Sequence, residues 1–225
     1  MFLTSLGTLA RAADQEASES ACVGSLAALS DLSWVEIGNH VLPTLVANAP
    51  VSNAVCTPFV NDILKCHILL LGKCSRLVVA SDLERWQVST PTLAHRAVEN
   101  LDRLAAPIDL NRIWLGSGLP EAVSHSSVVG TAAAWALTRS FQEKVRALQP
   151  GAWFVAMPQP DYLFAWPAGQ STDILALHLK DLKNQLSLAA AHRKVLTRQI
   201  FILFNAQLRI ASPQEVGSGL ATSER

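Results

Sequence analysis

The sequence predicts an α+β domain in which an antiparallel sheet is packed by helices, and three observations favour this fold class. Strand-like runs of branched and aromatic residues come in pairs, and two of these pairs are each followed by a helical pattern. A further pair lies near the end of the chain, and half of the 225 residues are hydrophobic, which is enough to fill a core. We therefore expect a sheet built from two hairpin-helix units and a C-terminal hairpin.

The chain divides into an arm, a domain and a tail. Residues 1–30 are rich in Ala, Ser and Glu with little periodicity, which predicts a flexible N-terminal arm. Residues 31–211 contain the periodic segments and are predicted to form the single α+β domain. Residues 212–225 are polar and contain glycine, so we expect a disordered tail.

In the first unit, the apolar spacing over residues 34–46 predicts a short helix. Residues 63–71 and 77–80 are two runs rich in branched side chains, separated by a short loop that contains glycine, and they predict a β-hairpin. A helix is predicted over residues 89–105, because a Ser-Thr-Pro start is followed by leucines and alanines on one face.

The second unit repeats this order of elements. Residues 153–157 and 162–166 are strand-like, and leucines at helical spacing follow a Ser-Thr-Asp cap over residues 171–186. Residues 199–204 and 207–210 predict the closing hairpin.

The stretch between the two units has a loop followed by a helical pattern. Residues 119–131 are rich in serine and bounded by glycines, and residues 132–148 carry apolar side chains at helical spacing. Long loops in compact domains often carry function, so this predicted loop is one place to look for a site.

The composition excludes some classes of partner. The 18 Lys and Arg residues balance 18 Asp and Glu residues, so no overall charge attracts nucleic acid or an anionic membrane surface. The apolar runs, such as residues 68–71, are all far shorter than the roughly 20 residues that span a bilayer. Charged residues make up only 16% of the chain, which suggests an apolar surface that meets a partner. We expect a protein partner or a homo-oligomer, no nucleic acid and no membrane.

The four cysteines, Cys22, Cys56, Cys66 and Cys74, have neither dense disulfide spacing nor the paired knuckles of a zinc site. Reduced thiols in a cytoplasmic protein are the economical interpretation, and the start of the chain lacks the basic region of a secretory signal. A metal sensor at the Cys66 to Cys74 hairpin stays as an alternative, although strand alternation sends Cys66 and His67 to opposite faces.

No motif predicts catalysis. Ser124 and His125 are adjacent in the chain, and neighbouring residues rarely present a nucleophile and a base to one another. The Gly-Ser-Gly at 116–118 lacks the lysine of a phosphate loop. We therefore expect no catalytic residue, no metal and no cofactor.

Four residues are candidates for binding a ligand or partner. Asp161 lies in a tight Pro-Gln-Pro-Asp connection, where accepting backbone N–H groups is the competing structural role. Asn100 lies in mid-helix beside the apolar stripe, where it either ties the helix to neighbouring backbone or binds a ligand. Trp86 and Trp166 end their elements and are expected at the rim of a packed face.

Short segments in a fixed order resemble the core pattern of the YtpQ-type bacterial proteins, a family of unknown function. In the first half they are residues 58–62, 77–79, 82–83, 86–89 and 97–101, and in the second half residues 153–158, Asp161, Leu163, 196–197 and 200–201. The likeness covers about residues 42–210, and it implies a cytosolic α+β protein without established chemistry.

The chain departs from the pattern of that family at two places. Members carry a Gly-Tyr-Asp-Ala-like segment where this chain has residues 129–133, and a basic residue where it has Pro160. If those polar residues serve the family's function, this chain has lost or changed it.

These observations favour a non-enzymatic protein-interaction or self-associating module that binds through an apolar sheet edge or the face near Trp86 and Trp166. The alternative is a small hydrolase or transferase with a polar site near Asp161, Asn100 and the 119–131 loop, which would need converging groups with strongly shifted pKa values.

Overall fold

The computed structural model describes residues 32–47, 53–71, 74–113, 122–127, 129–192 and 194–216. Its first part contains α2 (Trp34–Ile37), the 3-10 helix η2 (Gly38–His40), β1 (Val41–Ala47), β2 (Cys56–Val60), β3 (Ile63–Leu71), β4 (Cys74–Leu77), α3 (Ala80–Trp86) and α4 (Thr90–Ala105). Its second part contains β5 (Asn111–Ile113), β6 (Ala122–Ser126), the 3-10 helix η3 (Ala133–Leu137), α5 (Arg139–Leu148), β7 (Trp153–Gln159), β8 (Tyr162–Pro167), α6 (Thr172–Ala191), β9 (Ile200–Phe204), β10 (Gln207–Ile210) and α7 (Pro213–Val216).

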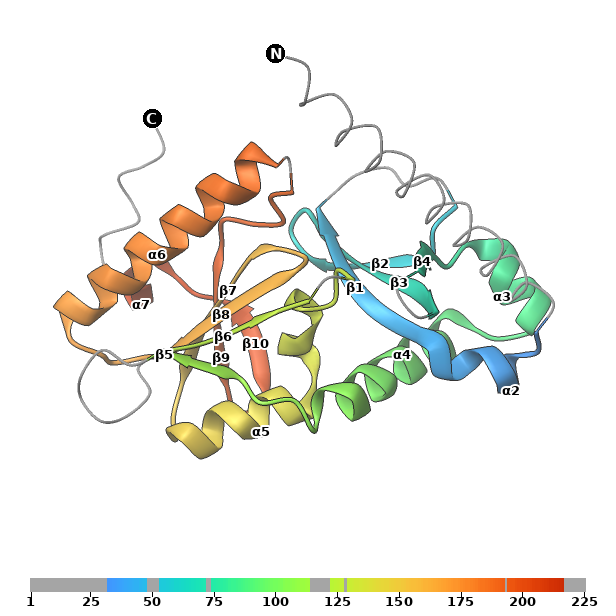
Figure 1. Ribbon diagram of the computed structural model, residues 1–225, viewed down its shortest axis with the longest axis horizontal. Helices are drawn as coiled ribbons and strands as arrows, with labels where there is room; N and C mark the ends of the chain where they lie inside the picture. Colours follow the sequence, from blue (N-terminus) through green and yellow to red (C-terminus); the bar gives the residue numbers. More distant parts are fainter. Residues whose placement is uncertain are drawn as a thin grey trace, which may run out of the picture.

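These elements form an α+β fold with antiparallel sheets, which confirms the predicted fold class (Figure 1). There are two sheets where the sequence suggests one. In the first, β3 pairs with β1 along one edge and with β2 and β4 along the other, so both edges of β3 are occupied. The second sheet has the order β10-β9-β7-β8-β6-β5. The two hairpin-helix units therefore lie in different sheets, and the C-terminal hairpin joins the second.

The helix predicted over residues 34–46 is wrong beyond His40. The helical part is α2 and η2, and the chain then extends as β1, paired with β3 from Val41↔Leu69 to Ala47↔Ile63. The first five residues of β1 are all buried, on both faces of the strand. A strand buried on both sides has no polar alternation, so its apolar run cannot be told from a helix by periodicity.

The loop predicted over residues 119–131 contains a strand. Residues 122–126 form β6, whose serines and His125 alternate between the two faces of the sheet. The helix predicted over residues 132–148 is interrupted at Thr138, which is extended, accepts a hydrogen bond from the N–H of Phe141 and donates one to the carbonyl of Trp135. Thr138 therefore ends η3 and caps α5.

The second strand of the first hairpin, predicted over residues 77–80, lies three residues earlier as β4, and Ala80 already begins α3. The other predicted elements are confirmed with small changes at their ends. Ser89 caps α4, because its hydroxyl accepts a hydrogen bond from the N–H of Thr92. Asn205 and Ala206 both have positive φ angles of 48° and 61°, which suits the two-residue turn between β9 and β10. The arm predicted over residues 1–30 lies outside the described residues, and the predicted tail begins with the short helix α7. Of the described helices, none has the length and apolar character needed to cross a bilayer.

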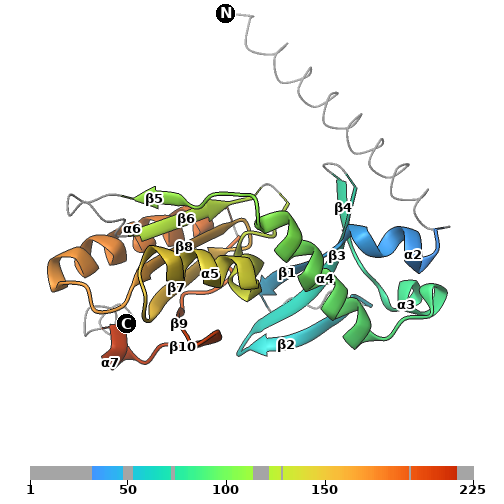
Figure 2. The ribbon, with the colours of Figure 1, turned by 90° about the horizontal axis from the view of Figure 1, so that it is seen from below.

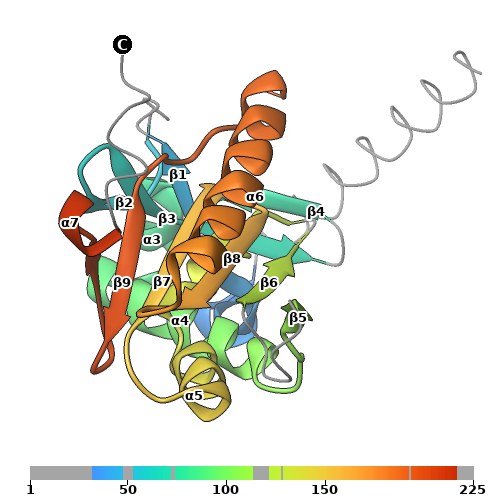
Figure 3. The same ribbon diagram turned by 90° about the vertical axis from the view of Figure 1, so that its left-hand side faces the viewer.

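Three clusters of buried side chains make the core. One lies between the two sheets and includes side chains of α4, η3 and α5, such as Leu101, Trp135 and Phe141. The second lies between the six-stranded sheet and α6 with α7, and the third joins the four-stranded sheet to α2, α3 and α4. Figure 2 shows the two sheets beside each other with α4 and α5 packed along them. Figure 3 shows α6 lying across β7 and β8 as an outer layer.

Candidate functional site

Both tryptophans proposed as a binding rim are buried, so that expectation is wrong. Trp166 is 0% exposed and its ring lies 5.2 Å from the ring of Phe164 and 5.7 Å from that of His178. Trp86 is 5% exposed and packs against Trp34. Both elements end inside the fold, because further helices and loops cover their last residues. Neither indole can touch a partner in this structure.

Asn100 has the structural role that its position suggests. Its side-chain amide donates hydrogen bonds to the carbonyls of Gly38, at 2.7 Å, and Val41, at 2.9 Å. Its carbonyl oxygen accepts a hydrogen bond from Arg103. Asn100 is 1% exposed, and both ends of its amide are engaged, so it joins α4 to the start of β1 and has no group left for a ligand.

We predict that Asn100→Ala lowers the free energy of unfolding by about 2 kcal/mol, because two buried carbonyls lose their donor. Urea denaturation measures this loss. Asn39→Ala is the matched control, since Asn39 is an exposed amide that contacts only the exposed Arg96 among the described contacts. Equal stability of the two variants would contradict the assigned role.

Asp161 lies in the turn between β7 and β8 and is partly exposed. Its backbone carbonyl accepts a hydrogen bond from the N–H of Ser127, and its Oδ2 lies 4.0 Å from Nζ of Lys194. Its Oδ1 is buried without a hydrogen-bond partner among the described residues and faces Gly130, which has a φ of +74°. The main chain of this turn therefore has a structural role. The carboxylate forms one long ion pair among the described residues, with the solvent-exposed side chain of Lys194.

The segment of residues 129–133 contacts both the β7–β8 turn and β1. The N–H of Ala133 donates to the carbonyl of Pro160 at 3.0 Å, and the carbonyl of Gly130 accepts a hydrogen bond from Thr44. Asn100 lies at another point, beside Val41, which is three residues from Thr44 along β1 and thus roughly 10 Å away. The structure therefore does not bring Asn100 and Asp161 together.

Ser124 and His125 point to opposite faces of the six-stranded sheet, as expected for adjacent residues of a strand. The ring of His125 stacks on Trp135 with 3.6 Å between centroids, and burial lowers the pKa of His125. On the other face, Ser124 contacts Tyr162, whose pKa is raised by burial, although that hydrogen bond lowers it. These residues do not form a nucleophile–base pair.

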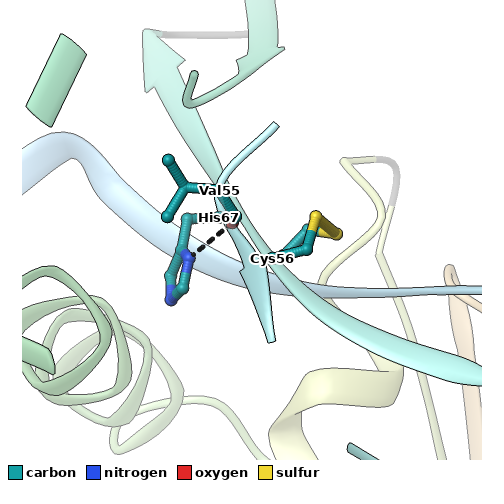
Figure 4. The surroundings of a disulfide bond; sticks show 4 residues. Val55, Cys56 and His67 are labelled. Atoms are coloured by element: carbon teal, nitrogen blue, oxygen red, sulfur yellow. Dashed lines mark hydrogen bonds between the residues drawn. A yellow bond between two sulfur atoms is a disulfide. The ribbon is translucent and has the colours of Figure 1, made fainter. Parts of the chain in front are cut away.

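Cys56 and Cys66 form a disulfide between β2 and β3, so the expectation of reduced thiols is wrong for this pair (Figure 4). The two residues are direct partners in the strand register, with Cα atoms 4.1 Å apart. His67 points to the opposite face, as predicted, and its Nδ1 bonds the carbonyl of Val55. Cysteines joined to each other cannot bind zinc, and the described part of the chain contains no cluster of three potential metal ligands.

We predict that replacing both Cys56 and Cys66 by serine lowers the free energy of unfolding by about 2 kcal/mol, because the bond closes a short loop in the unfolded chain. Urea denaturation without reductant measures this loss. Wild-type protein unfolded with reductant should be no more stable than the double variant, because reductant also breaks the disulfide bond of Cys74. A double variant as stable as oxidised wild type would contradict the prediction.

The most extensive ionic network lies elsewhere and was not predicted as a site. The carboxylate of Asp82, on α3, accepts two hydrogen bonds from Arg76 and one from Arg85, and it caps the helix through the N–H of Val79. Burial raises the pKa of Asp82, but the hydrogen bonds and charges of these partners outweigh it, so the pKa is lowered overall. All its lone pairs are engaged, which indicates a structural network.

The best-formed hollows of the described surface are small. One, of about 160 Å³, lies between α5 and the β9–β10 hairpin, and the other, of about 200 Å³, lies beside α7. Pockets that enclose a small molecule usually measure about 300–1,000 Å³. Neither hollow contains Asp161 or Asn100.

Helix α6 has the least complete burial of the long helices. Of its 20 residues, only His178, Leu182 and Ala189 are buried. Leu177 is 47% exposed and Leu188 is 55% exposed, and both are on the side away from the sheet. Sequence analysis missed this second face, because it considered only the stripe of leucines at helical spacing, which leaves out Leu177 and Leu188.

No family model, no curated protein and no solved structure matches this chain.

Proposed function

We propose that this protein is a non-enzymatic interaction module whose contact surface is the outer face of α6. The observation that carries the proposal is that α6 has apolar side chains on two faces and the fold covers one of them. A helix that is apolar on more than one side is usually buried on more than one side. The partner would cover the second face.

The two exposed leucines lie on the same side of the helix. Leu177 and Leu188 are separated by about three full turns of 3.6 residues, so their side chains project in nearly the same direction. By contrast, the large apolar side chains Phe141 and Val145 of α5 are both buried. Other large apolar side chains are also exposed, but each lies on a different element or loop, whereas α6 exposes two leucines on one side; these others are Val35, Leu104, Ile108 and Phe204.

The rival function, a small hydrolase or transferase, has less support. It needs Asn100 and Asp161 at one site with the loop of residues 119–131, but Asn100 uses its amide to hold β1 and η2. The part of that loop within the described residues is largely the strand β6. The hollows are also small for a substrate. Gly130 and Pro160, two positions that differ from the YtpQ-type pattern, have no ionisable side chain that could act as an acid or a base.

The sequence led us to propose the cytoplasm as the location of this protein. The Cys56–Cys66 disulfide argues against that location, because such bonds persist mainly in oxidising compartments. Thiol trapping in intact cells, with an alkylating reagent added at lysis, tests the location. Cysteines that are alkylated at once support the cytoplasm. Cysteines that react only after reduction overturn it.

A site-specific photo-crosslinker tests the contact surface in the cell. A benzophenone amino acid at position 177 or 188 should give one discrete cross-linked product, because both positions face the partner. The same group at Val35 or Leu104, which are exposed apolar residues elsewhere on the surface, should give none. Products at all four positions, or at none, would overturn the proposal.

A further inference from the structure

We infer that the occupant of the outer face of α6 is α6 of a second copy of this chain, packed antiparallel about a two-fold axis. This inference rests on the proposed function and names its partner. It follows from the pattern of exposed residues along the helix and from the distribution of charge at its ends.

The exposed stripe of α6 has the spacing of a helix-pairing seam. Its members are Leu177, Asp181, Asn184 and Leu188, spaced by four, three and four residues, and all four are exposed. Apolar residues at this spacing are those that interlock when two helices pack side by side at a shallow angle. The leucines are at the two ends of the stripe and the polar pair is at its centre.

The order of side chains along this stripe matches that of a second copy only when the two helices run in opposite directions. With the axis between residues 182 and 183, Leu177 lies opposite the partner's Leu188, and Asp181 lies opposite the partner's Asn184, whose amide can donate to it. A parallel pair would place Asp181 against the partner's Asp181. Two carboxylates at an interface repel each other and lose hydration, so the parallel arrangement is disfavoured.

The ends of α6 support the same direction. The first turn of the helix contains Asp173, and beyond its last turn lies Lys194, whose side chain is 61% exposed. Antiparallel pairing brings the acidic end of each helix toward the basic end of the other, and it also opposes the two helix dipoles. No described element covers the outer side of α6, which forms the outer layer in Figure 3.

The size of the contact predicts weak association. A helix of 20 residues is about 30 Å long, so a contact centred on one helix pair is at the small end of specific interfaces. We expect a dimer that forms with a dissociation constant on the order of micromolar and exchanges rapidly.

Sedimentation velocity of the full chain over a range of concentrations tests the inference. Wild-type protein should change from monomer to dimer as its concentration rises. Leu177→Asp and Leu188→Lys should each weaken dimerisation roughly 100-fold, because symmetry removes two leucine contacts and each accounts for about tenfold. Val35→Lys is the matched control and should dimerise like wild type, since Val35 is 85% exposed on α2.

Mixing the two variants tests the direction of the helices. One copy with Leu177→Asp and one with Leu188→Lys would pair the introduced carboxylate with the introduced ammonium in the antiparallel arrangement, and the second leucine contact would be intact. The mixture should therefore dimerise, while each variant alone stays monomeric. Circular dichroism confirms that each variant is folded.

Two results would overturn the inference. One is a wild-type chain that is monomeric at all concentrations, and the other is variants that dimerise unchanged. A monomer that still gives a photo-crosslinked product with a different protein at positions 177 and 188 refutes the second copy but leaves the proposed function standing. A monomer that gives no product at these positions refutes both.

Discussion

Trp166→Ala is expected to lower the free energy of unfolding by about 4 kcal/mol, the largest effect among the substitutions considered. Trp166 is fully buried between the six-stranded sheet and α6, where its ring contacts those of Phe154, Phe164 and His178. Truncation removes a large apolar side chain and leaves a cavity that the rigid sheet cannot close. Because α6 has only three buried residues, the loss also weakens its attachment.

The indole N–H of Trp166 has no hydrogen-bond partner among the described residues, so the packing of the ring accounts for its effect. Trp166→Phe keeps most of this packing and loses no hydrogen bond, and we expect a loss below about 1.5 kcal/mol. Phe204→Ala is the control on the same sheet, since Phe204 lies on β9 and is 52% exposed. Urea denaturation followed by circular dichroism measures all three. If Trp166→Ala costs no more than Phe204→Ala, the packing of α6 on β8 is refuted.

The hairpins and long helices could be predicted from the sequence because their signals are local. The cap at Ser89, the branched and aromatic runs of β7 and β8, and the turn at Asn205 and Ala206 each depend on residues close in the chain. By contrast, β1 is a strand because it pairs with β3 along one edge and packs against α4 and η3, which leaves its first five residues buried. That fact depends on contacts far apart in sequence, so the local apolar pattern predicted a helix.

The candidate site was predictable only in part for the same reason. A buried mid-helix amide must find partners, so the structural role of Asn100 followed from its position. The burial of Trp86 and Trp166 depends on which elements cover their ends, and the Cys56–Cys66 bond depends on the register of β2 against β3. The outer face of α6 could have been found from its sequence, because leucines at 177 and 188 are offset from the stripe formed by the other leucines.

Asp82→Ala is expected to lower the free energy of unfolding by about 3 kcal/mol at pH 7. Removing one partner of a buried ion pair typically costs roughly 3–5 kcal/mol, because the other charge stays buried and unpaired. The lower end applies here, since the side chains of Arg76 and Arg85 are 26% and 40% exposed and water can reach them. The N–H of Val79 also loses its acceptor at the start of α3.

Because of the same carboxylate, the free energy of unfolding of the wild-type protein decreases at acid pH. The pKa of Asp82 is lowered in the folded state, so its contribution is fully present above the pKa of an unfolded aspartate, about 4, and is lost as the pH falls through the folded value. Asp82→Asn should therefore flatten the fall in stability below about pH 4 as well as lower stability at pH 7. Asp62→Asn, at an exposed position in the β2–β3 turn, is the control. Urea denaturation from about pH 3 to 7 measures both effects, and an unchanged acid slope in Asp82→Asn would show that other carboxylates carry it.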